Sequence, residues 1–152
     1  MTEKIKIGAT VIVEKTNKKG ELIDKRVVHN TVVNSGFDLV SDLLGKTSSR
    51  PNYISHVGVG TSTATTTASM TALGTEWGSR VATTYSHTAG TTTFTLSCTI
   101  PEHTGSSVNI SESGLFNAST GGTMFNRITF TPIGKEAGDT ISIRYIINLV
   151  DQ

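Results

Sequence analysis

The sequence contains few of the residues that usually indicate a particular chemistry. Its single cysteine, Cys98, excludes an intrachain disulfide and a cysteine-rich zinc site. Because it has no run of 18 apolar residues, we expect no membrane-spanning helix. Charged residues make up only 16% of the chain, against about 25% in ordinary soluble domains, and the formal net charge is +1. We therefore expect neither nucleic acid nor a membrane surface as a partner.

Hydroxyl side chains take the place of the missing charges. The 152 residues include 26 threonines and 16 serines, and together with the 15 glycines these make up more than a third of the chain. Threonine favours strands because its branched Cβ restricts χ1 and packs well on a pleated surface. The composition therefore predicts an all-β fold.

The charged residues are unevenly distributed. Residues 1–50 carry nine lysines and arginines and six acidic residues, whereas residues 51–134 carry only five charges: Glu76, Arg80, Glu102, Glu112 and Arg127. Serine and threonine lose their hydration at a much lower cost than lysine or glutamate, so such a surface suits packing against a neighbouring protein. A polar β-surface that faces water explains the same composition. The sequence leaves both interpretations open.

Alternation of polar and apolar residues predicts a hairpin at the start of the chain. The apolar residues of 4–16 recur at every second position, which is typical of a half-buried strand. Residues 17–20 form a short turn that ends in Gly20, a residue suited to positive φ. Residues 21–33 then return as a second strand that pairs with the first.

A helix is predicted directly after this hairpin, near residues 36–44. Ser35 is suited to cap its N-terminus, and Gly45 is suited to end it. One face of the helix is apolar and is expected to pack on the rest of the fold: Phe37, Val40, Leu43 and Leu44.

Residues 53–150 are expected to form the main β-sandwich. Strands recur about every ten residues, with glycine-containing turns between them, which is typical of a sandwich or barrel. They are predicted at 53–59, 79–87, 91–100, 107–112, 123–132 and 140–150. The last is the most apolar, so we place it centrally with both faces buried. We predict one all-β domain over 1–152, a β-sandwich or jelly-roll-like fold of about eight strands, with a hairpin (1–33) and a helix (34–46) before the sandwich.

No cluster of residues predicts catalysis, a metal site or a cofactor. A zinc or iron site needs three or four convergent ligands, and the histidines are scattered: His29, His56, His87 and His103. Cys98 lies in an alternating segment and is expected to be an inert, half-buried thiol. A pair of glycosidase carboxylates could come from Glu102, Glu112 and Glu136, but each lies in or beside a turn with no aromatic platform nearby. We expect a protein without enzymatic activity or cofactor.

A pattern of glycine, aromatic and charged residues extends over roughly residues 30–150. Its second half comprises Glu112, Gly114, Leu115, Phe116, Asn117, Met124, Phe125, Arg127, Phe130, Pro132, Ile133, Lys135, Gly138, Asp139, Thr140 and Tyr145. Upstream it comprises Asn34, Gly36, Leu39, Leu43, Leu44, the stretch YISHVGVG at 53–60, Leu73, Glu76 and Arg80. This pattern resembles small virion proteins of tailed bacteriophages, found as capsid decoration proteins and as tail or fibre components. The resemblance implies a β-sandwich scaffold.

The resemblance and the composition together predict a non-enzymatic structural protein of a phage virion, made in the cytoplasm of the bacterial host. We first expect a capsid decoration protein that binds the outside of the head and stabilises the shell. The alternative is a tail, collar or fibre component involved in assembly or host adsorption. The expected partners are the phage major capsid protein or tail proteins, and a homo-oligomer is expected, with a trimer favoured because symmetric copies multiply weak contacts.

Two sets of residues are candidates for the functional site. The first is an interface drawn from the charged hairpin and the threonine-rich tract that follows residue 60: Lys4, Lys6, Lys18, Lys19, Arg26, Thr61, Thr63, Thr65, Thr66, Thr67 and Met70. We expect deletion of 61–70 to weaken shell binding with little effect on the fold. The second set is Glu112 and Arg127, which are expected to form a structural ion pair between neighbouring strands.

Overall fold

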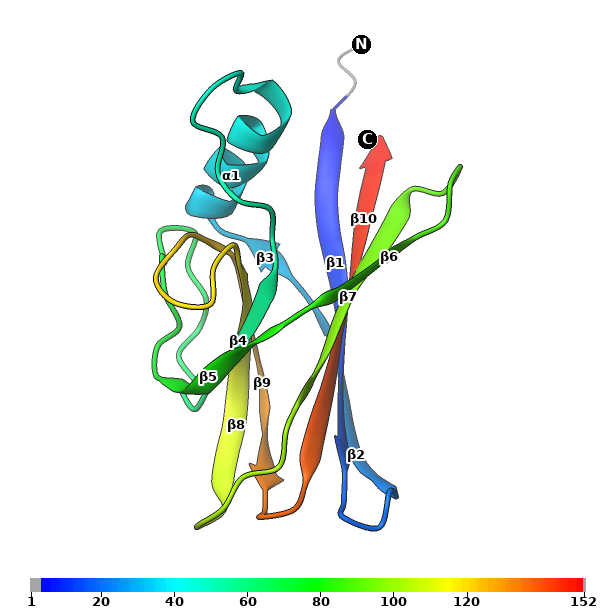
Figure 1. The fold of residues 1–152 in the computed structure, drawn as a ribbon, viewed down its shortest axis with the longest axis vertical. Coiled ribbons are helices and arrows are strands. Elements are labelled where there is room, and N and C mark those ends of the chain that lie inside the picture. The colour runs from blue at the N-terminus through cyan, green and yellow to red at the C-terminus, as the bar shows by residue number, and fades with distance from the viewer. Residues whose placement is uncertain (1–3, 152) are drawn as a thin grey trace.

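The computed structural model describes residues 4–151, which form ten strands and one helix. The strands make two five-stranded antiparallel sheets, which confirms the predicted all-β sandwich (Figure 1). Sheet A has the order β2-β1-β10-β7-β6, and sheet B has the order β3-β9-β8-β4-β5. The bounds are Ile5–Thr16 (β1), Leu22–His29 (β2), Thr31–Val32 (β3), Asn34–Gly45 (α1), His56–Gly60 (β4), Glu76–Ala82 (β5), Thr84–His87 (β6), Thr93–Ile100 (β7), Val108–Phe116 (β8), Met124–Lys135 (β9) and Thr140–Asp151 (β10).

The predicted N-terminal hairpin is present in sheet A. Strands β1 and β2 pair antiparallel, and Val11 lies opposite Val28. The Asn17 side-chain oxygen closes the turn by accepting the backbone N–H groups of Lys19 and Glu21, at 2.9 Å and 3.0 Å. Gly20 supplies the positive φ of +82° that the turn needs.

Two predicted strands are each divided between the sheets, which raises the count from about eight to ten. The segment 21–33 leaves sheet A at Asn30, and β3 then pairs with β9 of sheet B. The segment 79–87 is divided at Thr83: β5 pairs with β4 in sheet B, and β6 pairs with β7 in sheet A. Figure 1 shows this crossing as one long green ribbon. The pattern of polar and apolar residues gives no sign of either crossing.

Strand β10 is central in sheet A, between β1 and β7, as predicted. The prediction that both of its faces are buried is wrong. Ile141, Ile143 and Ile147 point into the core, whereas Ser142 and Arg144 are exposed on the outer face. The strand is therefore half-buried, and its high apolar content comes from the inner face.

The helix begins two residues earlier than predicted, at Asn34. Val33 is the N-cap residue and has no side-chain hydrogen bond to the helix. The Ser35 hydroxyl instead donates to the carbonyl oxygen of Met124 at 2.8 Å, which ties the first turn to β9. Gly36 faces the same strand so closely that a Cβ there would overlap the carbonyl oxygen of Phe125. The helix therefore rests directly on the backbone of sheet B.

The buried face of α1 also differs from the predicted one. Leu39 is buried, and Val40 and Leu43 pack partly against the core. Phe37 and Leu44 were expected on this face, but they are 51% and 84% exposed. The close contact at Gly36 sets the helix rotation, and this rotation turns both side chains outward.

The main core lies between the inner faces of the two sheets. Aliphatic residues from both sheets fill it: Val11, Val13, Ile141, Ile143, Ile147, Ile110, Leu115, Ile128 and Ile133. One polar connection crosses it, because the Tyr145 hydroxyl donates to Ser113 Oγ at 2.8 Å and the Ser113 hydroxyl donates to the Gly58 carbonyl oxygen at 3.0 Å. Burial raises the pKa of Tyr145, so this hydroxyl stays protonated and keeps donating.

Candidate functional site

The structure brings Glu112 and Arg127 together on the outer side of sheet B. They lie on the paired strands β8 and β9, and Arg127 Nε is 2.8 Å from Glu112 Oε2. Both side chains are 0% exposed. A buried ion pair is stable only when further hydrogen bonds satisfy both groups. The segment 61–75 supplies hydrogen bonds to both groups, although Arg127 Nη2 is buried without a partner among the described residues.

Three backbone N–H groups of this segment surround the Glu112 carboxylate. Thr75 and Gly74 donate to it at 2.8 Å and 2.9 Å, and Ser62 donates at 3.2 Å. Burial by itself raises the pKa of Glu112. The hydrogen bonds from these amides and from Arg127 outweigh burial and hold the pKa below its ordinary value, so the group is a carboxylate.

The same segment provides acceptors for Arg127. Its Nη1 donates to the Ala64 carbonyl oxygen at 2.8 Å and to Thr66 Oγ1 at 3.0 Å. Beside the pair lies a second, smaller apolar cluster in which Leu73 and the half-buried Met70 pack on three residues of the sheet B side: Val33, Phe116 and Met124. Segment 61–75 is thus a cover over the outer face of sheet B, held by polar bonds at its centre and by apolar contacts beside it.

This placement changes the interpretation of the threonine-rich tract. Thr63, Thr65 and Thr67 are exposed and available to a partner, whereas Thr61, Thr66 and Met70 are half-buried. The expectation that 61–70 is separable from the fold disagrees with the structure, because deletion would remove the partners of a buried ion pair. The sequence does not indicate that this segment is part of the fold, because most of its bonds to the ion pair are made by backbone groups.

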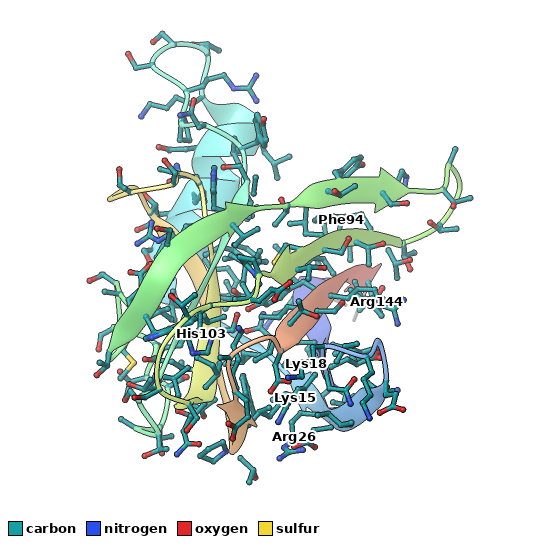
Figure 2. All side chains as sticks on the ribbon, turned by 60° about the horizontal axis from the view of Figure 1, so that its bottom comes forward. Lys15, Lys18, Arg26, Phe94, His103 and Arg144 are labelled. Carbon is teal, nitrogen blue, oxygen red and sulfur yellow. The ribbon has the colours of Figure 1, made fainter. Side chains whose placement is uncertain are left out.

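The five basic candidates of the hairpin do not form one surface. Lys4 and Lys6 are exposed at the start of β1, whereas Lys18 and Lys19 are exposed in the turn at the opposite end of that strand (Figure 1). Arg26 is half-buried, and its Nε donates to the Thr131 carbonyl oxygen of β9 at 3.2 Å. Figure 2 shows Arg26 and Lys18 at the same end of the molecule. The candidate interface residues therefore lie at both ends of sheet A and over sheet B.

An apolar groove at the helix end was missed by the sequence analysis. A cavity of about 410 Å³ opens between α1 and the ends of β1 and β10, with Leu43, Ile7 and Ile147 in its wall. A neighbouring one of about 450 Å³ extends from there toward Tyr53 and Tyr85. Large apolar side chains are exposed around both: Ile5, Leu44, Tyr53, Tyr85 and Leu149. The apolar helix residue Leu44 was the one sign of this groove in the sequence. It was predicted to pack on the fold, but in the structure it is exposed at the groove.

Among residues 4–151, no three or more histidine, cysteine or acidic side chains are gathered as metal ligands. Cys98 is buried, and this burial raises its pKa to about 12, so the thiol is unreactive at neutral pH. Among residues 4–151, no helix is long and apolar enough to cross a membrane.

The family profile described as "Podophage GP4 fiber I protein gp80" matches residues 37–146. The chain belongs to this family. It is thus a structural protein of the tailed-phage virion, which confirms the resemblance found in the sequence. The matched range begins in α1 and extends into β10, so it includes the ion pair and β4, β5, β8 and β9 of sheet B, whereas β1 and β2 of sheet A lie outside it. No curated protein and no solved structure matches the chain.

Proposed function

We propose that the protein is a structural component of a phage tail fibre. The observation that carries this proposal is the family match over 37–146, because the family is described by a fibre protein of a podophage. Decoration of the head was the first expectation from the sequence, and the match gives it no specific support. The tail or fibre alternative fits the family description.

The exposed apolar surface of the structure supports a role in assembly. Exposed apolar side chains gather around the groove at the helix end, where Leu44 is 84% exposed and Tyr53 is 74% exposed. Apolar surface of this extent is typical of proteins that bury part of their surface against other subunits. The two sheets and the covered ion pair provide a rigid body that positions this surface.

The proposed partners are tail proteins and further copies of the same chain. We propose a homo-oligomer, with a trimer favoured, because several copies increase the strength of weak contacts through avidity. Light scattering on the purified protein at several concentrations gives the number of copies. A mass of one chain at all concentrations contradicts the homo-oligomer.

Immunogold electron microscopy of intact virions tests the location. Antibody raised against the purified chain is applied to virions, to isolated heads and to isolated tails. The proposal predicts gold at tail fibres and on isolated tails, with unlabelled heads. Gold distributed over the head surface contradicts the proposal and makes the protein a decoration protein. Antibody that has first been absorbed with the purified chain serves as the control.

A further inference from the structure

The apolar groove at the helix end is continuous. Its two cavities, of about 410 Å³ and 450 Å³, share Leu43, Ile54 and Phe94 in their walls. Every residue that lines the first cavity is apolar. Pockets for small molecules usually contain a few polar groups that fix the orientation of the ligand. Because the first cavity has no polar side chain in its wall, it suits apolar side chains of a protein better than a small polar ligand.

The groove lies where the fold leaves an apolar surface uncovered. Figure 1 shows α1 on one side of it and the ends of β1 and β10 on the other. On the outer face of sheet B, the chain supplies its own cover, segment 61–75, which buries Leu73. The described part of the chain supplies no such cover at the groove, where Leu44 and Tyr53 stay exposed. A second molecule is therefore needed to bury this surface.

The exposed apolar area at the groove is large enough for a protein interface. Tyr53 and Tyr85 are 74% and 62% exposed, and a tyrosine offers about 200 Å². Ile5, Leu44 and Leu149 are 77%, 84% and 43% exposed, and an aliphatic side chain offers about 100 Å². These five side chains present roughly 500 Å² per copy. Two copies that bury them against each other remove roughly 1,000 Å² from water, the size at which a specific interface is expected.

The same face of the molecule carries both a projection and a recess. Leu44, near the C-terminal end of α1, is the projection, because it is far more exposed than its neighbour Leu43. The recess is the first cavity, which has Ile7 and the buried Ile147 in its wall. A contact in which each copy supplies one projection and one recess closes in a dimer or in a trimer. The face is therefore complementary to a second copy of itself.

Charges of opposite sign lie on the two sides of the groove. Helix α1 contains Asp38 and Asp42 and no basic residue, whereas Lys4 and Lys6 are exposed at the start of β1. Asp42 is already paired, because its Oδ2 is 3.2 Å from Lys46 Nζ, but Asp38 is exposed. When α1 of one copy approaches β1 of another, Asp38 and the two lysines attract each other. The charges therefore favour this approach.

We propose that the groove is the surface through which copies of this chain bind each other, with Leu44 of one copy seated in the groove of the next. This proposal rests on the homo-oligomer of the proposed function and names the surface that forms it. The area, the projection beside its recess and the opposite charges all belong to one face, which is what binding between identical copies requires.

Leu44→Lys tests this contact in the full chain. Leu44 is exposed, so the variant is expected to fold, and circular dichroism and thermal unfolding check this. The new charge enters the apolar groove of the neighbouring copy, and we expect association to weaken at least about tenfold in analytical ultracentrifugation. Leu22→Lys is the matched control, because Leu22 is 54% exposed at the opposite end of sheet A. It is expected to associate like the wild type.

Disulfide trapping identifies what occupies the groove. Two separate variants, Leu44→Cys and Leu149→Cys, are mixed and oxidised, and the proposal predicts a disulfide that joins one copy of each. Mass spectrometry of the linked pair identifies it. Cys98 does not compete, because it is buried and its pKa is raised to about 12. Leu22→Cys mixed with Leu149→Cys is the control and is expected to give few linked pairs.

The outcomes separate this proposal from the proposed function. An oligomer that persists in Leu44→Lys, or the absence of the mixed disulfide, overturns the groove contact and leaves the homo-oligomer standing. A wild type that is a single chain at all concentrations overturns both. If Leu44→Lys is then missing from virions, the groove binds a different tail protein. Immunogold labelling decides the location in the tail independently of all these results.

Discussion

The two sheets differ in what covers their outer faces. Sheet A leaves its outer face to solvent, so a central strand such as β10 alternates between buried residues and exposed ones such as Ser142 and Arg144. In sheet B, all seven residues of β8 from Ile110 to Phe116 are buried. The chain covers this sheet with its own segment 61–75, so the outer face of sheet B is a second interior.

This difference explains the scarcity of charge between residues 51 and 134. Four of the five charges in that range are paired within the molecule: Glu112 with Arg127 at 2.8 Å, and Glu76 with Arg80 at 2.7 Å. The Arg80 guanidinium also lies 3.5 Å from the Phe116 ring centroid. The sequence left open a surface packed on neighbours or a polar surface facing water. For sheet B the structure shows a third arrangement, a face covered from within.

Of the changes considered, Arg127→Ala is expected to lower the stability of sheet B most. It leaves the Glu112 carboxylate buried without its ion-pair partner, and we expect a loss of about 3–5 kcal/mol in the free energy of unfolding. Urea denaturation measures this loss. Arg144→Ala on the exposed face of sheet A is the control and is expected to stay within about 0.5 kcal/mol of the wild type. An Arg127→Ala protein that unfolds like the wild type but fails to assemble would place Arg127 at an interface instead.

The same pair predicts an acid dependence of stability. The pKa of Glu112 is lowered in the folded state, so the unfolded state binds more protons in acid and stability falls as the pH drops below the ordinary value of 4.5. Thermal unfolding between pH 6 and pH 3 follows this loss. Glu112→Gln is expected to be less stable at pH 6 and to lose less stability on acidification. An unchanged pH slope in that variant contradicts the assignment.

Gly36→Ala tests the close contact between the helix and sheet B. The added Cβ overlaps the Phe125 carbonyl oxygen, so the helix must shift, at an expected cost of about 1–3 kcal/mol. Gly45→Ala at the other end of α1 meets open space and serves as the control, with an expected gain of up to about 1 kcal/mol. Equal stabilities of the two variants in urea denaturation would contradict the contact.

Thr66→Val is expected to have the smallest of these effects, and it tests a single hydrogen bond between segment 61–75 and Arg127. It removes the hydroxyl that accepts from Arg127 Nη1 at 3.0 Å, and we expect a loss of about 1 kcal/mol. Thr65→Val, one residue away and exposed, is the matched control and is expected to change little. Differential scanning calorimetry compares the two melting temperatures. Equal melting temperatures would show that the Thr66 bond contributes nothing.

Alternation in the sequence predicts sheet A better than sheet B. The hairpin and the central position of β10 follow from apolar residues at every second position, because one face of sheet A is in water. Along β8 of sheet B both faces are buried, so polar groups such as Ser113 and Glu112 occupy interior positions and alternation is lost. The crossings at Asn30 and Thr83 depend on how the two sheets pack against each other. The order of polar and apolar residues within one segment does not indicate this packing.

The candidate site was predicted only in part for a similar physical reason. The scarcity of charge drew attention to Glu112 and Arg127, but their further partners are the backbone groups of Gly74, Thr75 and Ala64, which any residue could supply. The exposed groove and the burial of Lys135 depend on the rotation of α1 and on the position of loop 101–107. The spacing of residues in the sequence predicts neither this rotation nor this loop position.

Hydrogen exchange of the backbone amides of Gly74 and Thr75 tests the central claim most directly. Both amides lie in a connection outside the strands, yet each donates to the buried Glu112 carboxylate. We expect both amides to exchange as slowly as the amides of β8, because they become free only when sheet B unfolds. Exchange at the rate of an exposed loop would contradict it and make segment 61–75 a separable arm.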